Sequence, residues 1–166
     1  AAVSAGAPAA ASESTQETAA NSAQVLRSLA SATPGLAQRV VEAEGALPAL
    51  VNAIAAGGGG DTAKHCAEAL GYIARTDAAL AERVSDVPGA LPTLVAAVAA
   101  GGAEAASATQ QDTAAESAQV LGNIALGSPG LAGRVTGAEG ALPALVNAIA
   151  AVGGGRMATN CSMVLG

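Results

Sequence analysis

The sequence predicts an all-α fold, a right-handed superhelical repeat solenoid with three full repeats after a partial N-terminal repeat helix. The first observation is composition, because hydrophobic residues make up 51% of the chain, alanine dominates them, and Tyr72 is the only aromatic residue. Alanine has the highest helix propensity, so this composition favours closely packed helices over a sheet. The second observation is internal repetition, since similar segments recur along nearly the whole chain.

One segment recurs four times with a leucine at the matching position. The copies begin TAANSAQVL, TAKHCAEAL and TAAESAQVL, and the last, ATNCSMVLG, is truncated. These leucines follow one another after 44, 51 and 44 residues, and the long interval contains an insertion around residues 103–111; they are Leu26, Leu70, Leu121 and Leu165. A period of this length predicts helical units that bury their apolar faces against their neighbours.

The chain divides into residues 1–16 and a repeat domain at residues 17–166. The N-terminal stretch AAVSAGAPAAASES is of low complexity. We expect residues 1–16 to be disordered or loosely ordered, as a linker or the remnant of a targeting sequence.

Each full repeat is predicted to contain three helices, of which the first is short. It begins where Thr or Ser can accept hydrogen bonds from free first-turn amides: at Thr33-Pro34, Thr76-Asp77 and Ser128-Pro129. The second helix starts near a Gly-Ala-Leu-Pro sequence, where a first-turn proline is tolerated. Glycine-rich stretches end it. One of them, residues 57–61, is interpreted as a helix-to-helix loop, because the lysine of a phosphate-binding loop is missing.

The third helix is the leucine-bearing segment, and its apolar residues recur on one face at a period of about 3.6 residues. In the second copy these residues are Cys66, Ala67, Leu70, Ile73 and Ala74. Cys66 and Cys161 occupy the same small, core-facing position two repeats apart. We therefore predict buried free thiols, and neither a disulfide nor a metal site.

A three-helix unit with Gly-Ala-Leu-Pro-x-Leu-Val on one helix and Ala-x-x-Leu-x-Asn-Ile-Ala on the next resembles the armadillo repeat. The resemblance covers residues 17–166 and is closest at residues 118–125. HEAT repeats are the nearest alternative, but they lack the separate short first helix. The resemblance implies a concave groove of third helices that binds extended peptides. Importin-alpha-like grooves pair Trp with Asn, and only Asn123 matches here, which does not support nuclear-import cargo binding.

The face of the third helix opposite the core is the predicted partner-binding surface, because polar residues share it at spacings i, i+3 and i+7. The predicted residues are Asn21, Gln24, Ser28, His65, Glu68, Tyr72, Glu116, Gln119 and Asn123, with Asn160 and Met163 in the last copy. Regularly spaced side-chain amides can pair with the backbone of an extended chain. The alternative interpretation is a solvated polar face without a partner.

Charge and residue types restrict the function. A net charge of −6 and seven scattered basic residues argue against nucleic acid, and no charge-free run reaches the ~20 residues of a membrane span. His65 is the only histidine and no catalytic motif is present, so no catalysis, cofactor or metal is predicted. Glu68 and Glu116 make the face mildly acidic, so a neutral or basic protein or extended peptide is the expected partner.

Arginine recurs at one position of the first helix, at Arg39, Arg83 and Arg134. Glu42 and Asp86 follow the first two by three residues, which predicts ion pairs within each helix. The alternative is a basic ladder for an acidic partner.

These patterns predict a non-catalytic protein–protein interaction scaffold, either a groove binder or a structural subunit of a larger assembly. The alternative is an enzyme-associated or cofactor-binding subunit. The last copy stops at Gly166 where the earlier copies continue, so we expect further repeats of the same chain, or a partner, to cover this end. Two cysteines, too few for a disulfide framework, are typical of a reducing intracellular compartment. The cytoplasm is the expected compartment, and an organelle is the alternative.

Overall fold

The computed structural model describes residues 13–56, 61–103, 106–151 and 156–165, and all regular structure within these ranges is helical. This confirms the predicted all-α repeat solenoid. The described helices are α1 (Glu13–Ala32), α2 (Pro34–Glu42), α3 (Ala46–Ala56), α4 (Asp61–Thr76), α5 (Ala78–Asp86), α6 (Ala90–Gly101), α7 (Ala108–Gly127), α8 (Pro129–Gly137), α9 (Ala141–Ala151) and α10 (Arg156–Leu165).

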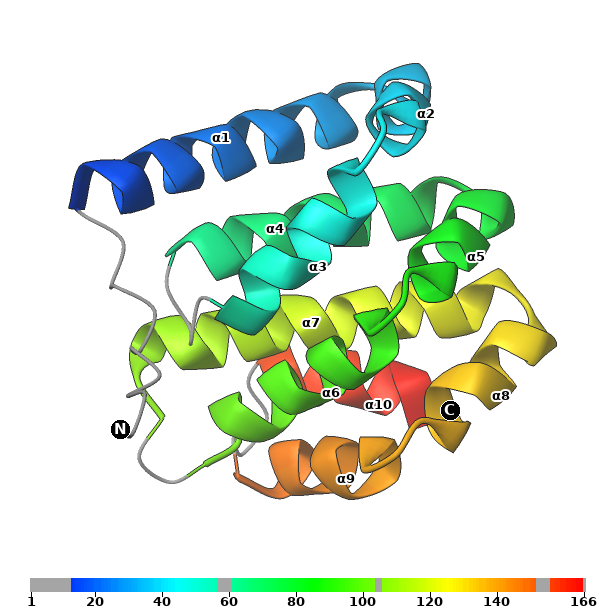
Figure 1. The fold of residues 1–166 in the computed structure, drawn as a ribbon. Helices are drawn as coiled ribbons and strands as arrows, with labels where there is room; N and C mark the ends of the chain where they lie inside the picture. The colour runs from blue at the N-terminus through cyan, green and yellow to red at the C-terminus, as the bar shows by residue number, and fades with distance from the viewer. Residues whose placement is uncertain (1–12, 57–60, 104–105, 152–155, 166) are drawn as a thin grey trace, which may run out of the picture.

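The helices are arranged in tiers, with equivalent helices of successive repeats side by side (Figure 1). The third helices α1, α4, α7 and α10 form one layer, in which each contacts the next. The second helices α3, α6 and α9 form the opposite layer, and the first helices α2, α5 and α8 follow one edge (Figure 1). Residues far apart in the sequence are therefore brought into register along one continuous surface.

The core follows the predicted third-helix face most closely in the middle of the stack. Leu70, Ile73, Leu121 and Ile124 are fully buried, so the two interior leucines of the register mark the core. Leu26 is half-buried, and the Leu165 side chain lies outside the described residues. Leu29 in α1 departs from the prediction, since its side chain is 38% exposed although its equivalents Ile73 and Ile124 are 0% exposed. The reason is position, because no described helix packs against the outer side of α1.

The first helices begin with the predicted side-chain caps, with one correction. Thr33 Oγ1 accepts a hydrogen bond from Leu36 N at 3.3 Å, and Ser128 Oγ accepts one from Leu131 N at 3.2 Å. In the second repeat the cap is Asp77 and not Thr76, which ends α4. The Asp77 carboxylate accepts this bond at a shorter distance than either hydroxyl does, 2.8 Å.

The turn between the first and second helices needs glycine in every repeat. Gly45, Gly89 and Gly140 have φ angles of 75°, 82° and 75°, a left-handed conformation that glycine adopts without steric cost. The second helix begins at the residue after each of them, as the Gly-Ala-Leu-Pro pattern predicts.

The insertion in the second repeat, between α6 and α7, lengthens a helix and not only a loop. The sequence places the start of this third helix near Thr113, whereas α7 begins at Ala108. A capping box explains the difference: Ser107 Oγ accepts from Gln110 N at 3.2 Å, and Gln110 Oε1 accepts from Ser107 N at 2.8 Å. At the N-terminus α1 likewise begins at Glu13, before the predicted boundary at residue 17. The loop predicted at residues 57–61 and the N-terminal residues 1–12 lie outside the described residues, apart from Asp61, which begins α4.

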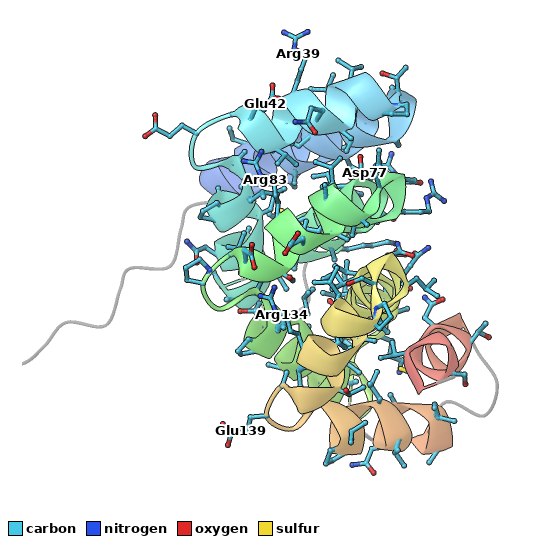
Figure 2. All side chains as sticks on the ribbon, turned by 90° about the vertical axis from the view of Figure 1, so that its right-hand side faces the viewer. Arg39, Glu42, Asp77, Arg83, Arg134 and Glu139 are labelled. Atoms are coloured by element: carbon cyan, nitrogen blue, oxygen red, sulfur yellow. The ribbon has the colours of Figure 1, made fainter. Side chains whose placement is uncertain are left out.

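The arginines of the first helices pair between repeats, which corrects the prediction of pairs within each helix (Figure 2). Arg134 Nη1 lies 2.8 Å from Asp86 Oδ1, and Arg134 Nη2 donates to Ser85 O at 3.0 Å. Arg83 Nη2 donates to Val41 O at 3.3 Å. Among the described residues neither Arg39–Glu42 nor Arg83–Asp86 forms an ion pair. The arginine of one repeat reaches back to the preceding first helix, and Arg39 points away from the body of the molecule (Figure 2).

Within the described part of the chain, membrane-spanning length and apolarity are not combined in any single helix. Among the described helices, α5 and α6 satisfy both criteria together, as a pair bent by 86°.

Candidate functional site

The nine predicted partner-binding residues lie on α1, α4 and α7, and their exposure falls from α1 to α7. Asn21, Gln24 and Ser28 on α1 are exposed, and His65, Glu68, Tyr72 and Gln119 are half-buried. Glu116 and Asn123 are buried, at 5% and 8% exposure, so these two do not share the open face that the spacing predicts. The Met163 side chain, predicted to continue this face, lies outside the described residues.

Hollows form along the described part of this third-helix face. The central hollow, of about 280 Å³, is shared by α4, α7 and α10, and its lining consists of Glu68, Gly71, Tyr72, Arg75, Glu116, Gln119 and Asn160. The α1 hollow, of about 420 Å³, is lined by Asn21, Gln24, Val25, Ser28 and Leu29. The structure thus brings five predicted residues together in the central hollow and three in the α1 hollow, while His65 and Asn123 line neither.

The central hollow contains two residues that the sequence analysis missed, Gly71 and Arg75. The guanidinium carbon of Arg75 lies 5.0 Å from the centre of the Tyr72 ring, a distance at which a cation is attracted to the ring face. Arg75 follows Tyr72 by three residues, so the helical spacing that selected Tyr72 could have identified it. Gly71 has no side chain, and only the structure indicates that its backbone borders the hollow.

Buried amides connect the third helices to one another. Asn123 Nδ2 donates to Gly71 O at 3.0 Å, from α7 to α4. Asn160 Nδ2 donates to Ala115 O at 2.9 Å, from α10 to α7. The amide predicted to bind a peptide backbone at Asn123 is therefore already engaged with the protein's own backbone.

Charges around the central hollow are partly compensated. Glu68 Oε2 lies 3.3 Å from Arg27 Nη1 on α1 and 3.1 Å from His65 Nδ1 on its own helix. Arg75 adds a further positive charge to the lining. The hollow is therefore less acidic than Glu68 and Glu116 indicate by themselves.

Two other hollows lie away from the third-helix face. The first, of about 380 Å³, lies between α3, α6 and the start of α7, and its lining is mostly alanine and other apolar residues, with Ile54 and Pro92 among them. The second, of about 470 Å³, lies between the first two repeats and includes Arg83, Asp86, Glu42 and Glu44. Neither joins three successive repeats, which the central hollow does.

The cysteines are buried and free, as predicted. Burial raises the pKa of the Cys66 thiol and that of the Cys161 thiol from 9.0 to about 11, because a thiolate loses its hydration there. Protonated thiols are poor nucleophiles and poor metal ligands. The described residues contain no group of three or more His, Cys, Asp or Glu side chains arranged to hold a metal ion.

No protein-family model matches the sequence, and no curated protein matches it either. Solved structures do. An engineered protein in a crystal structure is similar with a TM-score of 0.76 at 26% identity, over 95% of this chain and 58% of that chain. The designed armadillo repeat protein YIII(Dq)4CqI has a TM-score of 0.75 at 24% identity, over 95% and 59%.

A second designed armadillo repeat protein, YIII(Dq.V1)4CPAF, was solved in complex with the peptide (KR)4. Its TM-score is 0.51 at 20% identity, over 94% of this chain and 76% of that chain. The chain spans just under three fifths of the length of the first two neighbours. These likenesses confirm that the chain has an armadillo-like repeat fold.

Proposed function

We propose that this armadillo-like solenoid is a non-catalytic protein–protein interaction scaffold that binds an extended peptide segment on its third-helix face. The observation that carries the proposal is the central hollow, because it joins side chains from three successive third helices in one place. A segment lying across α4, α7 and α10 would contact each repeat in turn, as stacked repeats permit.

Tyr72 is the expected anchor. It is the only aromatic residue of the chain, and Arg75 lies over its ring at 5.0 Å. Tyrosine is enriched among residues that dominate binding energy, since it adds contact area and a hydroxyl at low entropic cost. Gln119, half-buried beside it, offers an amide with both donor and acceptor groups for the peptide backbone.

A neutral or basic peptide is the proposed partner class. Glu68 and Glu116 border the hollow, and the complex of a designed neighbour with (KR)4 supports a basic peptide as the first probe. Arg27 and Arg75 oppose this preference in part. We expect the binding of (KR)4 to weaken as the salt concentration rises, because salt screens the attraction between the peptide and the carboxylates. No described feature favours the enzyme-associated or cofactor-binding alternative.

The test is titration calorimetry with (KR)4 and with peptides selected from a random display library. Tyr72→Ala combined with Gln119→Ala should weaken the best peptide by more than about tenfold, or about 1.4 kcal/mol. The matched control is Arg39→Ala combined with Glu139→Gln, two exposed residues at the edge of the stack (Figure 2). Equal loss in both double variants, or no peptide selected at all, would remove the groove assignment.

A further inference from the structure

Two helices of this chain have the same sequence but bury partly different faces, since Leu50 and Leu145 are buried in both and their flanking residues are not. Both α3 and α9 read ALPALVNAIAA. In α3 Leu47 and Val51 are 6% and 3% exposed, whereas their equivalents Leu142 and Val146 in α9 are 45% and 54% exposed. Since composition is identical, only the neighbours can explain the difference.

The alanine face, which carries Ala144 and Ala148 in α9 and Ala49 and Ala53 in α3, shows the reverse pattern of burial. Ala144 and Ala148 of α9 are 7% and 0% exposed, whereas the equivalent Ala49 of α3 is exposed and Ala53 is half-buried. Each second helix therefore has a Leu/Val face directed to the following repeat and an alanine face directed to the preceding repeat.

The interior of the stack shows what covers the Leu/Val face. α6 packs on α3, and α9 packs on α6. A Cβ placed on Gly140 at the start of α9 would lie 3.9 Å from Val95 Cγ1, so the valine of α6 reaches the following repeat. Leu47, Val51 and Val95, which have a following second helix packed beside them, are buried. A Cβ placed on Gly102 at the end of α6 would lie 3.5 Å from Ala148 Cα, so the alanine side of α9 lies close to α6. On α9 the same face is exposed.

The arginine contacts between repeats give a second, independent observation. Arg83 and Arg134 each donate to a backbone carbonyl near the end of the preceding first helix, at Val41 and at Ser85. The equivalent carbonyl in α8 is that of Thr136, two residues after Arg134. An arginine from a further first helix would find its acceptor there.

We propose that the Leu142–Val146 face of α9, with the end of α8, is a docking surface for a further repeat-type helix pair. The partner is a short helix with one arginine followed by a helix that presents alanines. The surface lies at the end of the stack, apart from the peptide-binding face proposed above. Each of the two assignments can therefore be tested independently of the other. α9 carries no charged residue, so its face matches an uncharged helix and offers no counter-ion to a charged one.

The test uses thiol labelling of an extended protein. Residues 72–127 are appended after Gly166, because Leu165-Gly166 matches Leu70-Gly71 and the register of the third helix continues. The probe is Val146→Cys, placed in both the original and the extended chain. The native cysteines give little background at neutral pH, because both are buried and have pKa values of about 11.

If the surface takes a repeat, Cys at position 146 reacts readily in the original chain and about a hundredfold more slowly, or slower still, in the extended chain. The matched control, Ala49→Cys, lies on the exposed alanine face of α3 at the other end and should react equally in both chains. Arg83→Ala in the appended copy alone should restore part of the reactivity at position 146.

Three results would overturn the proposal. The first is equal labelling at position 146 in the two chains. The second is an extended protein whose circular dichroism shows no added helix, because a repeat that belongs on this surface folds on it. The third is a dimer of the original chain, seen by sedimentation equilibrium and abolished by Leu142→Ser with Val146→Ser, which would assign the face to a second copy. Binding of (KR)4 to these proteins is measured separately, and its loss would not change the interpretation of the labelling at position 146. Failure of the docking surface is therefore distinguishable from failure of the peptide-binding face.

Discussion

At the scale of single residues, substitution of two helical glycines by alanine is predicted to change stability in opposite directions. A Cβ on Gly101 would overlap the Ala114 side chain and lie 2.8 Å from Gln110 O, so this glycine lets α6 and α7 approach closely. Gly133 in α8 has nothing within 4 Å of such a Cβ. We expect Gly101→Ala to destabilise by about 1–3 kcal/mol and Gly133→Ala to stabilise by about 0.5–1 kcal/mol in urea unfolding. Stabilisation by both would mean that α6 and α7 do not approach so closely.

Asn123 is predicted to stabilise the fold. Its amide donates to Gly71 O in a buried position, whereas Ser28 holds the equivalent position on α1 and is exposed. Asn123→Ala should lower the free energy of unfolding by about 1 kcal/mol, and Ser28→Ala by less than about 0.5 kcal/mol. Unfolding midpoints in urea give the comparison. No loss for Asn123→Ala would return this amide to the candidates for peptide binding.

The buried thiols make stability depend on alkaline pH. The folded state holds the proton of Cys66 up to a pKa of about 11, while the ordinary value of 9.0 applies after unfolding. The contribution of this thiol is thus fully present below pH 9 and is lost as pH rises through 11. Between pH 8 and pH 10.5 the natural chain should lose on the order of 1–2 kcal/mol more than Cys66→Ala does. Parallel pH profiles of the two proteins would show that the thiolate is accommodated.

At the scale of elements, the capping box of α7 gives a direct test of the lengthened helix. Ser107→Ala removes the acceptor for Gln110 N and should cost about 1 kcal/mol. Ser107→Asp restores an acceptor and should recover most of that stability. Equilibrium urea unfolding measures both. If alanine and aspartate gave the same stability, residues 108–112 would not be held as a capped helix.

The same element shows why some boundaries follow from the sequence and others do not. The caps at Thr33 and Ser128 precede a proline, which fixes a first turn, and both were predicted correctly. The insertion before α7 is rich in alanine and follows glycines, so the repeat pattern places the helix start near Thr113, whereas Ser107 and Gln110 cap a helix that begins at Ala108. Composition alone does not separate an alanine-rich loop from a helical turn.

At the scale of the whole molecule, the repeat register predicts the fold better than the surface. Leu70 and Leu121 are buried because every interior repeat places the same face against the same neighbours. The polar face is also periodic, yet Asn123 turns toward the neighbouring helix while Ser28 faces solvent. Helical spacing specifies the face of one helix, but the depth of a side chain depends on the adjacent repeat, which sequence periodicity does not describe.

Position in the stack should also set local stability, which hydrogen exchange can measure. α4 and α7 have a third helix packed on both sides, whereas α1 has one on only one side, and α9 exposes Leu142 and Val146. In a solenoid each repeat is stabilised mainly by its nearest neighbours, so end helices open at lower free energy than interior ones. We expect peptides from α4 and α7 to exchange slowest by mass spectrometry, and those from α1 and α9 to exchange faster. Appending the further repeat should slow exchange in α9 and leave α1 unchanged. Uniform exchange across all helices would mean that the stack unfolds as one cooperative unit, and the nearest-neighbour description would then not apply.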